Sequence, residues 1–256
     1  MTLAKLGQHS LICLGCWEQQ RMPVFIRGPL AVPYRMLGLV PSRMNPNLCT
    51  RCEIGFASIY KTKQIRRPLT ILFADVRGYT RFSQLVDAPE VAKVLSGFYE
   101  ACGEEIWMRE GIVNKLIGDA VLGVFNFPLA REDHVARAAS AGMALLEKCR
   151  EVKLSLGEQV AAEAIGVGVG IHTGEASIGE VGEFCRDFTV IGPVVNLASR
   201  LQGAAHAGEV LLSDAAYRAA APAFPHAERR ELTLKGHDHP VTAWALKPSS
   251  TPVTQT

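Results

Sequence analysis

Two aspartates lie where short apolar runs meet glycine. Asp75 is found in Leu-Phe-Ala-Asp-Val-Arg-Gly-Tyr-Thr (72–80), and Asp119 in Lys-Leu-Ile-Gly-Asp-Ala-Val (115–121). Each run is typical of a buried strand, so each carboxylate is expected at a strand end beside flexible backbone. Carboxylates in that position can hold Mg²⁺ against a phosphate group. A single such aspartate is more often a turn or capping residue, so the hypothesis depends on the pair.

A third polar cluster occupies Asp-Phe-Thr-Val-Ile-Gly-Pro-Val-Val-Asn-Leu-Ala-Ser-Arg (187–200). A strand is expected to end before Gly192-Pro193, and the apolar residues that follow recur at helical spacing. Asn196 and Arg200 are four residues apart, which places them on one face of that helix. An amide and a guanidinium so arranged can grip a sugar and a phosphate together. A solvated helix face is the alternative interpretation.

Five segments together resemble the catalytic domain of the class III nucleotidyl cyclases, the adenylate and guanylate cyclase family. The matching segments are Leu72–Phe82, Asn114–Phe127, Gly168–Gly182, Asp187–Leu201 and Leu234–Leu246. They follow the order and spacing of the family and together span roughly residues 67–247. Several motifs in register are far more specific than any one of them.

The resemblance implies attack of a ribose 3′ oxygen on the α-phosphorus of a nucleoside triphosphate, with pyrophosphate leaving. Two Mg²⁺ or Mn²⁺ ions would lower the pKa of the attacking hydroxyl and bind the leaving phosphates. By resemblance, Asp75 and Asp119 hold both ions, and the Val76 carbonyl adds a ligand. Arg200 would stabilise charge on the α-phosphate, and Asn196 would orient the ribose.

The polyphosphate is expected to bind to backbone N–H groups where a strand turns into a helix. These groups run from Arg77 through Gly78 and Tyr79 to Thr80. Lys235 is similar, more loosely, to a phosphate-binding lysine of the family. A surface lysine at a strand end is the alternative for Lys235.

Base choice is expected to depend on Lys115 and Thr189. By resemblance these are the purine-binding positions, four residues before Asp119 and seven before Asn196. A lysine donates to the unprotonated N1 of adenine, whereas the N1–H of guanine favours an acidic residue. Thr189 can accept from the adenine amino group. Many family members have Asp at this position, whereas a bacterial subgroup that this chain resembles has Thr. The pair predicts ATP over GTP, although β-propensity alone would also explain Thr189.

In the family, active sites form between two head-to-tail subunits. One subunit supplies the metal-binding aspartates, and the other supplies the purine pair with the helical Asn and Arg. Because this chain holds every required group, the resemblance implies a homodimer with two equivalent sites.

Three motif positions are interpreted as structural. Gly192-Pro193 departs from the Gly-Asp that usually precedes the Asn/Arg helix, which we interpret as a change in packing. Arg77 and His172 are motif residues of the family, and we expect both to support the fold rather than the reaction.

The residues between the motifs predict the elements that must position them. Strands are expected at 69–74, 111–117, 120–125, 164–172 and 175–181, and helices at 89–109 and 132–152. This β-α-β-β-α-β order is the ferredoxin-like plan of an α+β domain. The resemblance implies further strands at the C-terminal end.

Four of the seven cysteines form two Cys-x-x-Cys pairs, Cys13 with Cys16 and Cys49 with Cys52, separated by 32 residues. Two such pairs can complete a tetrahedral metal site, mainly for Zn²⁺ and alternatively for an iron–sulfur cluster. The intervening loop is longer than in a typical zinc ribbon, and its glycines and arginines predict little regular structure. A redox-active dithiol pair, or unpaired cysteines packed in a core, would also account for the pattern.

The N-terminal part that contains these cysteines also differs in charge from the rest of the chain. Residues 1–67 carry ten Lys/Arg and two Glu, a net charge of +8, which leaves −6 for the rest. We therefore predict a basic Cys-rich segment (1–66), a catalytic domain (67–247) and a disordered tail (248–256). The basic segment is expected to bind a regulatory partner or an anionic surface, or to pack on its own catalytic domain; nucleic acid is not the expected ligand.

Composition fits a soluble cytoplasmic enzyme, with 48% hydrophobic residues and a mean hydropathy of +0.13. No apolar run reaches the roughly 18 residues of a membrane span, and no secretory signal is evident. Cys102, Cys149 and Cys185 are expected to pack as small apolar residues in a reducing cytosol. The main hypothesis is an adenylate cyclase; a guanylate cyclase and a non-catalytic nucleotide-sensing or metal-binding module are the alternatives.

Overall fold

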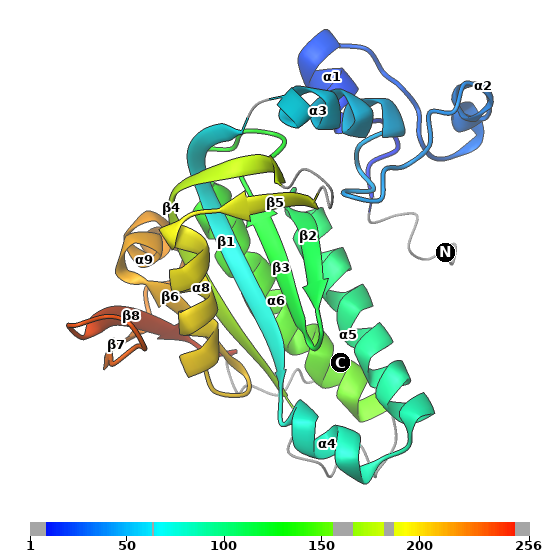
Figure 1. The fold of residues 1–256 in the computed structure, drawn as a ribbon. Helices are drawn as coiled ribbons and strands as arrows, with labels where there is room; N and C mark the ends of the chain where they lie inside the picture. Colours follow the sequence, from blue (N-terminus) through cyan, green and yellow to red (C-terminus); the bar gives the residue numbers. More distant parts are fainter. Residues whose placement is uncertain (1–8, 63, 156–165, 182–186, 249–256) are drawn as a thin grey trace.

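A mixed sheet of eight strands forms the centre of the computed structural model, which describes residues 9–62, 64–155, 166–181 and 187–248 (Figure 1). The strands are β1 (Ile65–Arg77), β2 (Ile112–Ile117), β3 (Ala120–Phe125), β4 (Gly166–Val181), β5 (Asp187–Ile191), β6 (Glu209–Ser213), β7 (Glu228–Leu232) and β8 (Val241–Leu246). Their order is β2-β3-β1-β4-β6-β8-β7, and β5 pairs with β4 off this path.

The helices that follow β1 connect these strands in the predicted order. They are α4 (Tyr79–Leu85), α5 (Ala88–Met108), α6 (His134–Ser155), α8 (Pro193–Ala204) and α9 (Asp214–Ala220). The neighbours in β2-β3-β1-β4 are all antiparallel, and β1 leads through α5 to β2 whereas β3 leads through α6 to β4. The ferredoxin-like α+β plan is therefore confirmed. The further C-terminal strands β6, β7 and β8 are confirmed as well.

Strand β1 is buried on both faces. Leu72 and Ala74 pack with α5 and α6 in one core cluster, whereas Ile71 and Phe73 pack on the opposite face with α8 and the N-terminal segment. Successive side chains of a strand point to opposite faces, so a strand covered on both sides must be apolar throughout. This explains the continuous apolar run before Asp75.

One prediction about the strands is wrong. Residues 164–172 and 175–181 were expected to form two strands, but β4 is a single strand from Gly166 to Val181, with residues 164 and 165 outside the described part. The reason is β1, which extends beyond the predicted 69–74. Its residues pair with β4 continuously from Ile65 opposite Ile178 to Arg77 opposite Gly166. Because all 13 residues of β1 pair with β4, the ladder continues past Gly174 and keeps β4 one strand.

The N-terminal segment is more regular than predicted. It contains α1 (Leu14–Gln20), η2 (Pro29–Ala31), α2 (Val32–Met36) and α3 (Thr50–Thr62). Its buried Ile26, Leu48 and Phe56 belong to the same core cluster as one face of the sheet. Burial against the sheet therefore orders a segment whose own composition gives little core. Nearly all of the predicted disordered tail, residues 249–256, lies outside the described residues.

Helix α8 lies directly on the backbone of β4. A Cβ atom on Gly170 would come within 2.1 Å of the Gln202 nitrogen and 2.4 Å of the Ala198 oxygen. Both atoms belong to the helix backbone and cannot move aside as the end of a side chain could. Only glycine at this position allows so close a contact, and this contact seats the helix that carries Asn196 and Arg200.

We expect Gly170→Ala to lower the free energy of unfolding by on the order of 3 kcal/mol, because the added methyl group forces α8 off the sheet. The matched control is Gly203→Ala in α8, where an added Cβ meets nothing within 4 Å. It should be neutral or stabilise by about 0.5–1 kcal/mol through helix propensity. Urea unfolding followed by circular dichroism measures the stability of both variants. Equal stability of the two would contradict the close contact between α8 and Gly170.

Candidate active site

The two metal-binding candidates meet at one end of the sheet. Asp75 on β1 pairs with Ala120 on β3, and the N–H of Val76 donates to the Asp119 carbonyl over 3.2 Å. Burial raises the pKa of Asp75, and the negative charge of the neighbouring Asp119 raises it further. Two crowded carboxylates at a strand end are the donor set that Mg²⁺ or Mn²⁺ would neutralise, so these residues fit such an ion.

Gln202 is a residue of this site that the sequence prediction missed. Its Nε2 donates to Asp75 Oδ2 over 2.8 Å, and Gln202 itself is buried. A signal was present in the sequence. Gln202 follows Ala198 by four residues, so a polar side chain occupies a position on the apolar face of α8.

Arg77 makes a second contact with the same oxygen of Asp75. Its Nη1 lies 3.7 Å from Asp75 Oδ2, and the guanidinium packs over Gly168, where a Cβ would come within 2.6 Å of the Arg77 Nε. Arg77 was interpreted as structural, and this contact adds an electrostatic role. Together with Gln202 it fixes the carboxylate and offsets part of its charge.

The candidate phosphate loop follows directly after Asp75. Gly78 has φ 76° and begins α4, so the chain turns sharply between the strand and Tyr79. That conformation favours glycine. Thr80 is exposed and Tyr79 is half-buried, so the backbone around them lies at the surface beside the aspartates.

The turn that carries Asp119 is fixed by a helix. The hydroxyl of Tyr99 on α5 donates to the Gly118 carbonyl, and Gly118 has φ 59°. Burial, chiefly, raises the pKa of Tyr99, which keeps its hydroxyl a donor. Nothing in the sequence around Tyr99 indicated this long-range contact.

The purine-binding candidates lie on two strands, Lys115 on β2 and Thr189 on β5, and β2 has a β-bulge next to Lys115. Val113 pairs with Gly123 and Lys115 pairs with Leu122, so Asn114 is an extra residue of β2. The Nδ2 of Asn114 donates to the carbonyl of Phe188 on β5 over 3.1 Å, one residue before Thr189. A bulge re-aims the side chains next to it. Asn114 thereby joins the strand of Lys115 to that of Thr189, a role the sequence prediction missed.

The remaining candidates gather at α8. Asn196 is exposed and Arg200 is half-buried on this helix. A Cβ on Gly236 would lie 3.0 Å from the Nη2 of Arg200, so the turn after the exposed Lys235 contacts that guanidinium. The structure therefore places the loosely matched Lys235 beside the segment that Arg200 touches.

Thr189 and Asp75 lie at different levels of β4. Thr189 pairs with Gly179, whereas Asp75 pairs with Gly168, eleven residues away along β4. That is as much as about 35 Å of strand at ~3.3 Å per residue. Asn196 likewise lies about 9 Å along α8 from the Gln202 that touches Asp75.

His172 has the surroundings of a structural residue. Its Nδ1 lies 2.7 Å from Ser213 Oγ, and burial lowers its pKa to about 4. A neutral imidazole bonded to a neighbouring strand holds β4 to β6. This agrees with the structural interpretation of His172.

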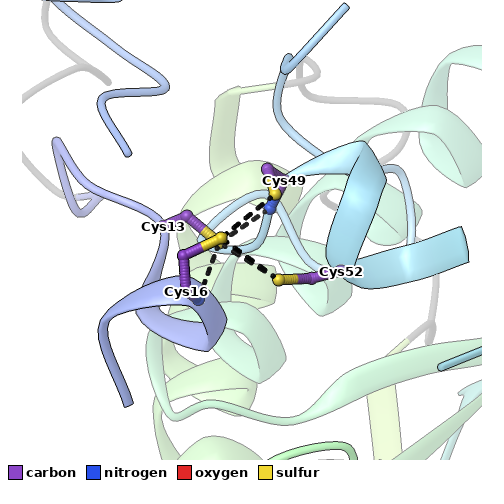
Figure 2. Close-up of side chains that lie close together, drawn as sticks. All are labelled: Cys13, Cys16, Cys49 and Cys52. Atoms are coloured by element: carbon purple, nitrogen blue, oxygen red, sulfur yellow. Dashed lines mark hydrogen bonds between the residues drawn. The ribbon is translucent and has the colours of Figure 1, made fainter. Parts of the chain in front are cut away.

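The four cysteines of the N-terminal pairs converge, as Figure 2 shows. Their sulfur atoms all lie within 4.8 Å of one another, although the pairs are far apart in the sequence. The cluster of Cys13, Cys16, Cys49 and Cys52 is largely buried. The sequence predicted these four residues as one metal site, and the structure brings them together.

Comparison with known proteins gives a consistent result. The family model described as the adenylate and guanylate cyclase catalytic domain matches residues 61–248. An adenylate cyclase of Anabaena cylindrica is 32% identical over 173 residues, which cover 67% of this chain and 32% of that protein. Guanylate cyclase 32E of Drosophila melanogaster is 28% identical, with 70% of this chain and 15% of that protein covered. The chain thus spans about a third or less of the length of these relatives.

Solved structures of both kinds of cyclase share the fold. The guanylyl cyclase Cya2 matches with a TM-score of 0.66 and 30% identity, over 71% of this chain and 92% of its own. The adenylyl cyclase CyaB from P. aeruginosa matches with a TM-score of 0.67 and 27% identity, over 73% and 97%. Among the described residues, no helix is both long and apolar enough to cross a bilayer.

Asp75→Asn is expected to raise the Tm of the metal-free protein at pH 8 by about 2 °C. The raised pKa of Asp75 means that its ionised form destabilises the folded state, and this penalty is present above the folded pKa. The penalty and the gain from Asn both vanish as the pH falls through that pKa. Thermal unfolding from pH 4 to pH 8, with the exposed Asp238→Asn as control, measures the effect. If the Asp75→Asn variant had a lower Tm than the wild type at pH 8, the charge of this carboxylate would not destabilise the folded protein.

Proposed function

Because this chain belongs to the adenylate and guanylate cyclase family, we propose that it is an adenylate cyclase that converts ATP to 3′,5′-cyclic AMP and pyrophosphate. The observation that carries the choice of base is the bulge at Asn114, which joins the strand of Lys115 to that of Thr189. An ammonium that donates to adenine N1, next to a hydroxyl that accepts from the amino group, suits ATP.

The residues of the chain divide the chemical work. Asp75 and Asp119 would hold two Mg²⁺ or Mn²⁺ ions, which supply charge that acidifies the 3′ hydroxyl and stabilises the leaving pyrophosphate. Gln202 and Arg77 keep the Asp75 carboxylate in place before the ions bind. The backbone N–H groups from Gly78 to Thr80 bind the polyphosphate.

The candidates on α8 act on the sugar and the α-phosphate. Asn196 orients the ribose, and Arg200 donates to the charge that develops on the α-phosphate in the transition state. Lys235, beside the turn that Arg200 contacts, adds a positive charge for the leaving phosphates. Loss of one such charge-stabilising donor typically lowers the rate by on the order of 10²–10³.

A head-to-tail homodimer completes the site. By the resemblance, one half-site of a chain holds Asp75 and Asp119, and the other holds Lys115, Thr189, Asn196 and Arg200. A second copy of the chain would supply the half that each site lacks. Exposed apolar side chains next to the candidates support this arrangement. Leu116 and Ile117 follow Lys115 and are 53% and 50% exposed, and Ile191 near Thr189 is 45% exposed. Such residues are suited to burial between subunits.

Guanylate cyclase is the second candidate, because guanylate cyclases are among the similar proteins. Lys115 argues against it, since guanine presents N1–H where adenine presents a lone pair. We place the enzyme in the cytosol, where the free thiols of Cys102 and Cys149 remain reduced.

Lys115→Glu tests the choice of base. We expect kcat/KM for ATP to fall by about 10²-fold and that for GTP to rise, because the carboxylate leaves adenine N1 without a donor and accepts from guanine N1–H. Lys93→Glu makes the same charge change at an exposed position of α5 and should alter neither value. Cyclic AMP and cyclic GMP are measured by mass spectrometry. A wild-type enzyme that prefers GTP would overturn the assignment.

Mixing inactive chains tests the shared site. Asp75→Ala and Arg200→Ala proteins should each be inactive, and their 1:1 mixture should recover about a quarter of wild-type activity. Half of the dimers are then mixed, and each mixed dimer holds one intact site.

The matched control is a mixture of Asp75→Ala with Asp119→Ala. Both substitutions damage the metal-binding half, so every site in every dimer is broken and no activity should return. Recovery in this control, or none in the first mixture despite mixed dimers seen by native mass spectrometry, would contradict the proposed division of the site.

A further inference from the structure

The four-cysteine cluster (Cys13, Cys16, Cys49 and Cys52) has the dimensions of a site for one metal ion. Its sulfur atoms are 3.6 Å apart for Cys13–Cys52 and Cys16–Cys52 and 3.7 Å apart for Cys16–Cys49. A tetrahedron of thiolates about 2.3 Å from a central zinc ion has edges of about 3.8 Å. A disulfide needs its sulfurs about 2.05 Å apart, so these distances do not describe a pair of disulfides.

The same distances argue against an iron–sulfur cluster. Such clusters place several iron and sulfide atoms between the cysteine ligands, which must then stand further apart than the 4.8 Å that encloses this set. Zn²⁺ also binds thiolate ligands more tightly than Fe²⁺ does. We propose that the four-cysteine cluster binds one Zn²⁺ ion and that this ion locks the N-terminal segment onto the junction between α5 and β2.

The local backbone is built to stabilise thiolates. Cys13 Sγ accepts from the N–H groups of Cys16 at 3.5 Å and Cys49 at 3.1 Å. Each Cys-x-x-Cys pair stands at the N-terminal end of a helix, α1 or α3, where unpaired N–H groups favour negative charge. Gly15 leaves room for the cluster, since a Cβ there would lie 2.9 Å from Cys52 Sγ.

A buried cation fits the charge of the proposed site. Four thiolates around Zn²⁺ leave a net charge of −2, which must be offset when the site is buried. Arg27 in the same segment is 2% exposed and donates to the carbonyls of Ser10 and Pro46, each over 2.6 Å. These two bonds join the segments that precede Cys13 and Cys49. The N-terminal segment thus buries one positive charge.

The metal site continues into the catalytic domain through a set of hydrogen bonds. Asn45 Nδ2 donates to the Gly111 carbonyl over 2.8 Å, and Trp107 Nε1 donates to the Met44 carbonyl over 2.9 Å. Asn47 Nδ2 donates to the Trp107 carbonyl over 3.2 Å. These residues immediately precede Cys49 on one side, and lie at the end of α5 and the start of β2 on the other.

Strand β2 gives this contact a functional consequence, which rests on the proposed function. It begins at Ile112 and carries the Asn114 bulge and Lys115. A zinc ion that fixes Cys49 fixes the preceding loop, and the loop holds the start of β2. The metal would therefore stabilise the start of the strand that carries Lys115.

Metal content of the full-length chain tests the site. We expect one zinc per chain by plasma mass spectrometry, and Co²⁺ added to the chelated protein should give the intense absorption of tetrahedral cobalt thiolate. Cys52→Ser should lose the ion, whereas Cys52→His, which keeps a zinc-binding set, and the control Cys149→Ser should retain it. Acid-labile sulfide, mononuclear iron, or no bound metal after anaerobic purification would each overturn the assignment.

Hydrogen exchange tests the lock without any measurement of activity. Removal of zinc by a chelator should speed amide exchange in residues 44–49 and 106–113 by roughly tenfold or more, while β6 remains unchanged. Asn45→Ala should speed exchange in residues 106–113 but keep the zinc. Unchanged exchange at residues 106–113 in the metal-free protein would show that the ion serves the N-terminal segment alone. Loss of enzyme activity is not a readout here, so this result is independent of the reaction proposed above.

Discussion

The antiparallel pairing of β1 with β4 is the interaction on which the rest of the structure depends. It runs from Ile65 opposite Ile178 to Arg77 opposite Gly166 without a break. One end of the paired strands presents Asp75, and the other end lies beneath the N-terminal segment and β5 (Figure 1). Helix α8 is seated on the middle of the pair at Gly170. Asp75 on β1, Thr189 on β5 and the candidates on α8 are therefore each positioned relative to this one ladder.

Local patterns in the sequence predicted the elements that short-range physics controls. The apolar run before Asp75, the hairpin around Gly118 and the helical spacing after Gly192 each follow from neighbouring residues, and each is present. The continuity of β4 was missed because it depends on the length of a partner about a hundred residues away. Gln202 and Tyr99 were missed for the same reason, since each acts through a contact between distant elements. The bulge at Asn114 appears only when β2 is aligned with β3.

The charges of the candidate site destabilise the folded protein when no cation is bound. Asp75 and Asp119 are placed side by side, and Gln202 and Arg77 offset only part of the cost. A structure selected for stability alone would replace one of these carboxylates. Two crowded carboxylates at adjoining strand ends form an arrangement that a bound cation would neutralise, and for this reason they are candidates for a metal site.

The backbone contact at Gly170 limits how this protein can be controlled. At Gly170 no side chain separates the peptide groups of α8 from the strand, so the helix has little room to slide or rotate at this point. The surface that carries Asn196 and Arg200 must then move as a rigid body with the whole sheet. In the proposed homodimer, a regulatory signal would therefore change how one chain is oriented against the other, by a rigid-body rotation about their interface.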